Sequence, residues 1–358
     1  MLPYLRRAAV CLLTVAAPLL SAQSALQAQQ TQKPWPIKAV IVTTFEIGKD
    51  EGDVPGEFQL WVEREHLTET LDFPGGIHPI RTNPEHTVLG ILSGTTLVNA
   101  TTSLMALGTD TRFDLTHAYW LVNGIAGVDP ADAGIGSAAW ANYVVNDISR
   151  YIDPREMPKD WPTGYFAIGA HEPNKLPPSG GVINDRVNAY KLNTKLTTWA
   201  YNLTKDTQLL DSPQVAEFRK GFTGYPNAQK PPMVMIGDTF ASDSYWHGKL
   251  MTDFANDWVK LFTDGQGNFV MTEMEDSGFT EAMKRLDRMK RVDYQRLMVL
   301  RTGSNFSMPR PGHTPIESVN SPYIGTRPAV ENAWRVGSRV LHELTSKWET
   351  YATHVPGE

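Results

Sequence analysis

The chain has 358 residues, of which 41% are apolar, 20% charged and 10% aromatic, and its formal net charge is −6. This composition is that of an ordinary soluble globular protein, and it excludes both a disordered chain and a bundle of membrane helices. A chain of this length can hold one large α/β domain or two smaller ones.

The first 24 residues have the organisation of a secretory signal peptide. Arg6 and Arg7 precede an apolar run over 8–20, and small residues follow at 22–24, as signal peptidase requires. The apolar run is shorter than the ~20 residues that span a bilayer, which argues against an uncleaved membrane anchor. We therefore expect an exported protein, periplasmic or extracellular, with a flexible leader over 25–36 and one domain over 37–358.

Removal of the signal peptide changes the chemistry that is available to the chain. Cys11 is the only cysteine and lies inside the signal, so disulfides, thiolate nucleophiles and cysteine metal sites are excluded. The remaining 31 basic residues face 39 acidic ones, a formal charge of −8. Since affinity for phosphate backbones comes from clustered Lys and Arg, we expect no binding of a nucleic acid polymer.

Apolar runs rich in β-branched residues predict buried strands, which in chain order cover 37–44, 88–92, 118–122, 232–236, 268–271 and 297–300. Helical spacing of apolar residues predicts helices over 98–107, 187–201, 279–289 and 329–351. This alternation predicts an α/β fold, a three-layer α/β/α sandwich with a mostly parallel central sheet. The Pro/Gly-rich stretch 153–183 is expected to be a long surface loop and not a domain boundary.

Several common chemistries are excluded by inspection. The sequence contains no Gly-x-Ser-x-Gly elbow, no His-Glu-x-x-His zinc helix, no phosphate loop and no calcium loop. Residues 134–139 match the dinucleotide fingerprint, but they follow a turn and not a strand, so we expect only a turn that leads into the next strand. No pair of histidines has metal-ligand spacing. We expect neither a metal nor a cofactor.

Three segments combine side chains suited to a small ligand. Small residues over 122–127 directly follow a predicted strand, where open α/β sheets bind ligands, although small residues also simply allow a turn. Phe240 can stack on a planar ligand, or it can be part of the core. Glu275 can accept hydrogen bonds from vicinal sugar hydroxyls, or it can be one of the acids that a helix N-terminus favours.

Together, these segments resemble those of the nucleoside phosphorylase and nucleosidase superfamily, whose members cleave N-glycosidic bonds on one α/β domain. The chain length, the long middle loop and the signal peptide make it resemble the purine nucleoside permease family within that superfamily. The resemblance implies a purine nucleoside as ligand, with 123–127 closing the pocket. It implies that the substrate-binding residues are Gly94, Thr95, Gly124, Phe240, Glu273, Met274 and Glu275.

The residue expected to face the purine N7 is Asn305, in a segment 300–305 that resembles the superfamily's strand end. Related nucleosidases carry aspartic acid there, and an amide donates a hydrogen bond but supplies no proton. This departure shifts the resemblance toward phosphorylases that use asparagine for 6-oxopurines, so inosine and guanosine become the expected ligands.

The nucleophile side departs further from the phosphorylases. Val122 and Ile125 stand where the resemblance implies phosphate-binding side chains, which favours water, held with the help of 93–96 at a helix start. Arg81 is the residue that would overturn this preference. The resemblance implies a catalytic glutamate after the first strand, and Glu57 matches its placement best, with Glu46 second.

These observations predict an exported purine nucleosidase linked to nucleoside uptake, with Glu57 and Asn305 as its catalytic residues. Two alternatives remain open: a nucleoside-binding component that serves a membrane transporter, and a phosphate-dependent phosphorylase. A homodimer is the oligomeric state that we expect.

Overall fold

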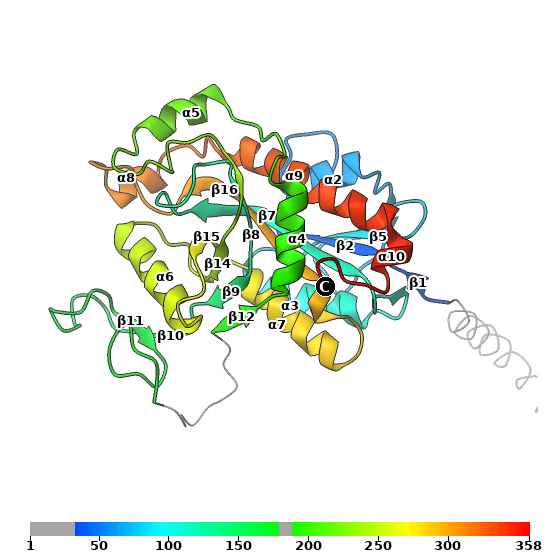
Figure 1. Ribbon diagram of the computed structural model, residues 1–358, viewed down its shortest axis with the longest axis horizontal. Coiled ribbons are helices and arrows are strands. Elements are labelled where there is room, and N and C mark those ends of the chain that lie inside the picture. Colours follow the sequence, from blue (N-terminus) through cyan, green and yellow to red (C-terminus); the bar gives the residue numbers. More distant parts are fainter. Residues whose placement is uncertain (1–32, 179–187) are drawn as a thin grey trace, which may run out of the picture.

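The structure is a computed structural model that describes residues 33–178 and 188–358 (Figure 1). The signal peptide expected over 1–24 and most of the expected leader lie outside these residues. The last two leader residues form a short strand, β1 (Trp35–Pro36), which pairs in parallel with β6 (Phe113–Asp114). The end of the segment expected to be flexible is therefore attached to the domain.

A mixed sheet of twelve strands forms the centre of the molecule. Its middle is parallel and consists of β5 (Val88–Leu92), β2 (Ala39–Thr43), β7 (Tyr119–Val128) and β16 (Leu297–Phe306). The other strands are β3 (Glu69–Leu71), β4 (Ile80–Thr82), β8 (Ala138–Trp140), β9 (Tyr143–Asn146), β12 (Ala189–Lys191), β13 (Val234–Ile236), β14 (Asp238–Ala241) and β15 (Phe269–Glu273). Antiparallel pairing occurs at both ends, where β3 and β4 follow β5 and where β12 joins β9.

Helices cover both faces of this sheet (Figure 1). On one face α3 (Thr96–Thr109) and α7 (Asp276–Arg288) pack on alternate strand residues such as Val40, and on the other α4 (Thr194–Thr204) and α9 (Thr326–Ser346) pack on their neighbours such as Ile41. The remaining helices are α2 (Gln59–Arg64), α5 (Pro213–Lys220), α6 (Lys249–Phe262), α8 (Pro315–Val319), α10 (Trp348–Tyr351) and the 3-10 turn η1 (Tyr294–Arg296). The predicted three-layer α/β/α sandwich is confirmed.

Two strands run further than the sequence predicts, and this changes the setting of two expected site residues. β7 and β16 pair in parallel almost along their whole lengths, from Leu297 opposite Trp120 to Phe306 opposite Val128. Gly124 and Asn305 therefore lie in strands and not in the loops that follow them. Backbone pairing with β16 orders this part of β7, because three of the four residues over 124–127 are glycine or alanine and show no strand pattern in the sequence.

The Pro/Gly-rich middle of the chain contains a small sheet of its own. β10 (Ser149–Tyr151) pairs antiparallel with β11 (Tyr165–Ala167), and the segment projects from the body of the molecule in Figure 1.

The prediction for 134–139 is confirmed, since a turn there leads into β8 and not into a helix. Helix α4 begins at Thr194, seven residues after the predicted start at 187, which lies outside the described residues.

No helix within residues 33–178 and 188–358 combines the length and the apolar character needed to cross a membrane.

The packing of α7 on α3 yields a stability prediction. Leu286 of α7 is fully buried in the cluster that joins these helices to the sheet, so Leu286→Ala should lower the free energy of unfolding by about 2–5 kcal/mol. Leu250→Ala in α6 removes the same atoms from a side chain that is 72% exposed, and should cost less than about 0.5 kcal/mol. Urea unfolding followed by circular dichroism measures both, and equal losses would contradict the assigned packing.

Candidate functional site

Arg301 is the centre of a buried ionic cluster that the sequence analysis did not identify. It lies on β16 with a side chain that is 1% exposed, and its Nη2 is 2.6 Å from Asp276 Oδ1 and 3.3 Å from Glu275 Oε2. Glu273 Oε2 lies 3.7 Å from the same nitrogen, and Glu57 Oε1 lies 4.0 Å from Nη1. The signal in the sequence is an arginine directly after the apolar run 297–300 of β16.

The junction between β15 and α7 places three of these carboxylates. Glu273 ends β15, Glu275 precedes α7, and Asp276 is the first residue of that helix. Glu273 Oε2 accepts hydrogen bonds from the backbone N–H groups of Glu275 and Asp276, both at 2.7 Å. The turn is thereby closed by its own side chain, and the expected ribose-binding residues Glu273 and Glu275 come together around Arg301.

The cluster contains more negative than positive charge. Four buried carboxylates surround one guanidinium. Burial opposes the charge on Arg301, but the four carboxylates outweigh it and raise the pKa of Arg301. In the part of the chain that the structure describes, no three Asp, Glu, His or Cys side chains are grouped as metal ligands.

Burial and the neighbouring charges change how the carboxylates titrate. Burial raises the pKa of Glu57, and burial with the nearby Asp276 raises the pKa of Glu273 well above its usual value. Burial also raises the pKa of Glu275 to about 7, although Arg301 opposes the shift. Of these groups, Glu275 exchanges its proton near neutral pH, and a cation that enters the site would favour the charged form of the carboxylates.

Glu57 is held between the residue that follows β2 and the interior of β7. Its Oε2 accepts from Thr44 N at 2.8 Å and from Thr44 Oγ1 at 2.7 Å, and its Oε1 accepts from Ile125 N at 2.7 Å. The structure brings Glu57 to the cluster, where it lies opposite Arg301. Glu46, the second choice from the sequence, instead accepts from the backbone of Phe58 and Gln59 at the start of α2.

Gly124 has a steric role in this cluster. A Cβ atom on Gly124 would lie 2.5 Å from both Arg301 Nη1 and Glu57 Oε1. The side chains of Arg301 and Glu57 therefore approach across a backbone position that only glycine allows. Gly124 therefore contributes to the site by leaving space for the side chains of Arg301 and Glu57.

The segment around Gly94 and Thr95 is occupied by the protein's own carboxylates. Thr95 is the N-cap of α3, and the next two amides donate to Glu275 Oε1 at 3.1 Å and to Asp243 Oδ1 at 2.8 Å. Gly94 has a φ of +85°, which glycine adopts at little cost. Arg81, the residue able to favour phosphate, makes two hydrogen bonds of 2.7 Å to Asp50.

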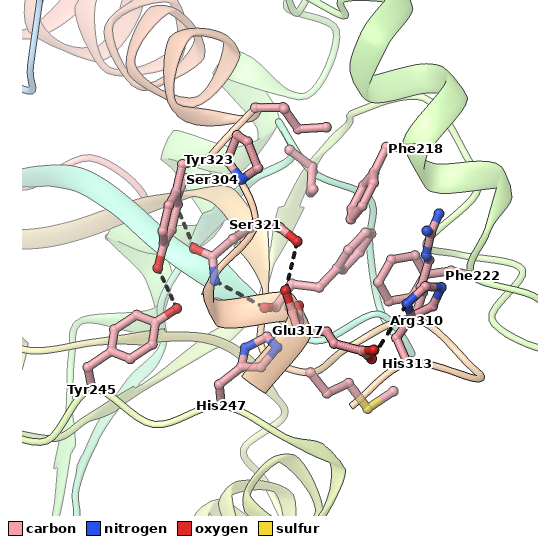
Figure 2. A pocket seen from close by; sticks show the side chains of 17 residues that line it. Phe218, Phe222, Tyr245, His247, Ser304, Arg310, His313, Glu317, Ser321 and Tyr323 are labelled. Carbon is pink, nitrogen blue, oxygen red and sulfur yellow. Dashed lines mark hydrogen bonds and ion pairs between the residues drawn. The ribbon is translucent and has the colours of Figure 1, made fainter. Parts of the chain in front are cut away.

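Two cavities meet at Asn305, and their walls include Tyr245 in common. The smaller encloses about 300 Å³ and is lined by Gly127, Ser244, Tyr245, Trp246, Thr272, Glu273, Met274, Asn305 and Ser307. The larger encloses about 680 Å³ and extends between α5 and α8 (Figure 2). The amide of Asn305 donates to Phe306 O at 3.0 Å and accepts from Ser304 Oγ at 3.0 Å. The structure thus joins Glu273, Met274 and Asn305 at one cavity.

Phe240 is the expected site residue that the structure places elsewhere. It lies in β14 with no exposed surface, and its ring packs against Trp246, Phe254 and Phe269 with ring centroids 5.8–6.3 Å apart. It lines neither described cavity. The reason is α6, a helix that the sequence analysis did not foresee, which carries Phe254 and covers this part of the sheet.

Comparison with known proteins gives the family. A family model described as "Purine nucleoside permease (NUP)" matches residues 36–356. The chain belongs to the purine nucleoside permease family. The resemblance found in the sequence is thereby confirmed.

Curated members of the purine nucleoside permease family have similar sequences over most of their length. The purine nucleoside permease of Candida albicans is 30% identical over 329 residues, covering 88% of this chain and 78% of that protein. The probable purine nucleoside permease C285.05 of Schizosaccharomyces pombe is 29% identical over 280 residues, covering 75% and 79%.

Solved structures show that this purine nucleoside permease family member has a nucleosidase-like fold. The 5'-methylthioadenosine/S-adenosylhomocysteine nucleosidase of Neisseria meningitidis, in complex with methylthio-immucillin-A, superposes with a TM-score of 0.50 at 12% identity. The corresponding enzyme of Helicobacter pylori, with butyl-thio-DADMe-Immucillin-A, gives 0.50 at 15%. Each match covers 86% of this chain and 99% of the nucleosidase.

The raised pKa of Glu275 predicts a pH-dependent stability. Its folded value of about 7 exceeds the usual 4.5, so the protonated group stabilises the fold fully below pH 4.5, and this contribution is lost as the pH rises through 7. Glu275→Gln cannot titrate, and its unfolding free energy should fall less steeply over pH 4.5–7, by up to about 1.4 kcal/mol per pH unit.

Urea titrations at half-unit pH intervals measure this slope. Glu349→Gln, an exposed position in α10, is the control and should reproduce the slope of the unmodified protein. Parallel slopes for Glu275→Gln and the unmodified protein would contradict the prediction.

Proposed function

We propose that the protein is an exported purine nucleoside-binding enzyme that cleaves the N-glycosidic bond, with water as the acceptor. The observation that carries the proposal is the acid-rich cluster around Arg301, which shares Glu273 with the small cavity. The name of the family and the nucleosidase fold support purine nucleosides as the substrate class. The signal peptide read from 1–24 supports export.

In this proposal the ribose lies between Met274 and the carboxylates of Glu273 and Glu275. Glu273 and Met274 line the small cavity, and Glu273 Oε1 is buried without a hydrogen-bond partner among the described residues. Carboxylate oxygens accept hydrogen bonds from vicinal hydroxyls. Ribose hydroxyls would satisfy the free oxygen of Glu273 and add a second set of contacts at Glu275.

The reaction places positive charge on the ribosyl group, which is the charge that this acidic cluster favours. As the bond from C1' to N9 breaks, its electron pair moves to the purine and the ribosyl group becomes cationic. The developing cation favours the ionised form of the carboxylates around Arg301, and these carboxylates stabilise it. The oxygen of a water molecule then bonds to C1', its proton passes to Glu57, and the purine takes up a proton from solvent.

Glu57 and Asn305 have separate roles in this scheme. Because burial raises the pKa of Glu57, its carboxylate is a stronger base than an exposed one. Asn305 exchanges its local hydrogen bond to Phe306 O for one to the purine N7, and so stabilises the departing base without supplying a proton.

Two features favour water over phosphate. Glu275 and Asp243 already occupy the amides at the start of α3, which would otherwise attract an anion. Arg81 is paired with Asp50 and also lies 3.1 Å from Glu51. A membrane transporter partner, which the link to uptake implies, would act on the nucleoside or on the released base.

Base release from nucleosides tests the proposal. Purified protein incubated with inosine, guanosine and adenosine should release free base without phosphate, as measured by chromatography. Glu57→Gln should bind inosine within about threefold of the unmodified protein but lose 10²-fold or more in turnover, the order of magnitude of general base catalysis. Glu275→Ala should instead weaken inosine binding, and Glu349→Gln should behave as the unmodified protein.

Each other outcome has a distinct meaning. Binding without base release in either buffer would contradict the enzyme and favour a binding component of a transport system. Release that requires phosphate would contradict water as the acceptor. Equal losses of affinity in Glu57→Gln and Glu275→Ala would contradict the division of roles.

A further inference from the structure

The large cavity combines an aromatic wall with polar groups. Phe222 and Phe306 pack with ring centroids 3.9 Å apart, and Phe218 lies 5.8 Å from Phe222. Phe222 and Phe306 are buried, whereas Phe218 is partly exposed. Figure 2 shows Phe218 and Phe222 on one side of the space and Tyr245, Tyr323 and His247 around the other. Such a wall favours a planar aromatic group.

His247 is the unusual residue of this cavity. Both ring nitrogens are buried, and within the described structure neither has a hydrogen-bond partner. Burial lowers the pKa of His247, so the ring is neutral at pH 7. Since buried polar atoms are nearly always paired, two unpaired nitrogens that line a cavity indicate a place for a ligand.

The other titratable groups of the cavity have different arrangements. His313 Nδ1 is 3.8 Å from Glu317 Oε2, and Glu317 caps α8 through Thr314. The guanidinium of Arg310 lies 5.9 Å from the centre of the Phe218 ring. Among the described residues that line the large cavity, His247 is the one with buried side-chain polar atoms that have no hydrogen-bond partner.

We propose that the large cavity receives the purine base and that His247 recognises the hydrogen-bonding edge of that base. This inference rests on the proposed function and assigns the base position, which Phe240 does not fill. The order along the site is then ribose at the small cavity, Asn305 at the junction and the base at the large cavity.

A neutral imidazole has one donor and one acceptor, and its two tautomers exchange them. A 6-oxopurine presents an N1–H donor beside an O6 acceptor, whereas a 6-aminopurine presents an N6–H donor beside an N1 acceptor. His247 can satisfy either edge by changing its tautomer. The site should therefore bind inosine and adenosine with affinities within about tenfold of each other, a broader preference than Asn305 alone suggests.

The opening of the cavity is bounded by two tyrosines from distant segments. The hydroxyl of Tyr323 donates to the hydroxyl of Tyr245 (Figure 2), and each side chain is about half exposed. His247 lines the same cavity with its ring nitrogens out of contact with solvent.

Calorimetric binding in the Glu57→Gln background, which avoids turnover, tests the role of His247. Inosine, adenosine and purine riboside, which lacks the 6-substituent, are titrated into the parent and into His247→Phe and His247→Asn. His247→Phe should weaken inosine and adenosine about tenfold or more, the effect of losing a buried hydrogen-bonding partner. It should change purine riboside least, and His247→Asn should retain part of the affinity. His117→Phe, at an exposed position that lines neither cavity, is the control, with changes below about threefold.

The failure of this inference is distinguishable from failure of the proposed function. If His247→Phe and the parent bind both nucleosides equally, His247 does not recognise the base, while base release by the unmodified protein still supports the enzyme. If the unmodified protein neither binds nor cleaves nucleosides, both proposals are wrong. Should His247→Phe not fold, as judged by its circular dichroism, unchanged affinities in His247→Asn together with a preference of more than 10²-fold between inosine and adenosine would overturn the inference.

Discussion

The pairing of Arg301 with four carboxylates is the interaction on which the rest of the site depends. It connects β16 to the junction of β15 and α7 and to the loop before α2. Asp276 makes the closest contact, and its partner atoms are almost wholly inaccessible to solvent. Removing either partner of such a pair leaves a buried charge uncompensated, so this contact holds the surrounding acids in place. The other three carboxylates then occupy an environment that makes their ionisation unfavourable.

The backbone around this cluster is adapted to the crowding. The space at Gly124 lets Arg301 and Glu57 approach, and the Ile125 amide points at the Glu57 carboxylate. Gly124 and Ile125 lie on β7, and the pairing of β7 with β16 fixes their position relative to Arg301. Strand pairing thus mainly determines where the charged groups lie, and the loops contribute the carboxylates. A site built on paired strands holds its groups more precisely than one built on loops alone.

The fold and part of the site were predictable from the sequence, because both depend on local patterns. Apolar runs identified the central strands, and the local Glu-Met-Glu pattern singled out Glu273 and Glu275, which the structure brings together around Arg301. Phe240 and Arg301 show what local patterns miss. The aromatic character of Phe240 suits a core as well as a ligand, and only the packing of α6 decides between them. The role of Arg301 depends on acids 25 to 244 positions away along the chain, a relation that no spacing rule contains.

The contacts at the start of α3 affect the binding of free anions to the protein. Glu275 and Asp243 are attached to the same chain as the amides that they accept from. A tethered carboxylate cannot diffuse away, and its effective concentration at the helix end stays high whatever the surrounding solution contains. A free anion would have to displace an intramolecular ligand and leave that ligand's charge without its partner. The carboxylates of Glu275 and Asp243 therefore compete with free anions for these amides, and Glu275 also faces the cluster around Arg301.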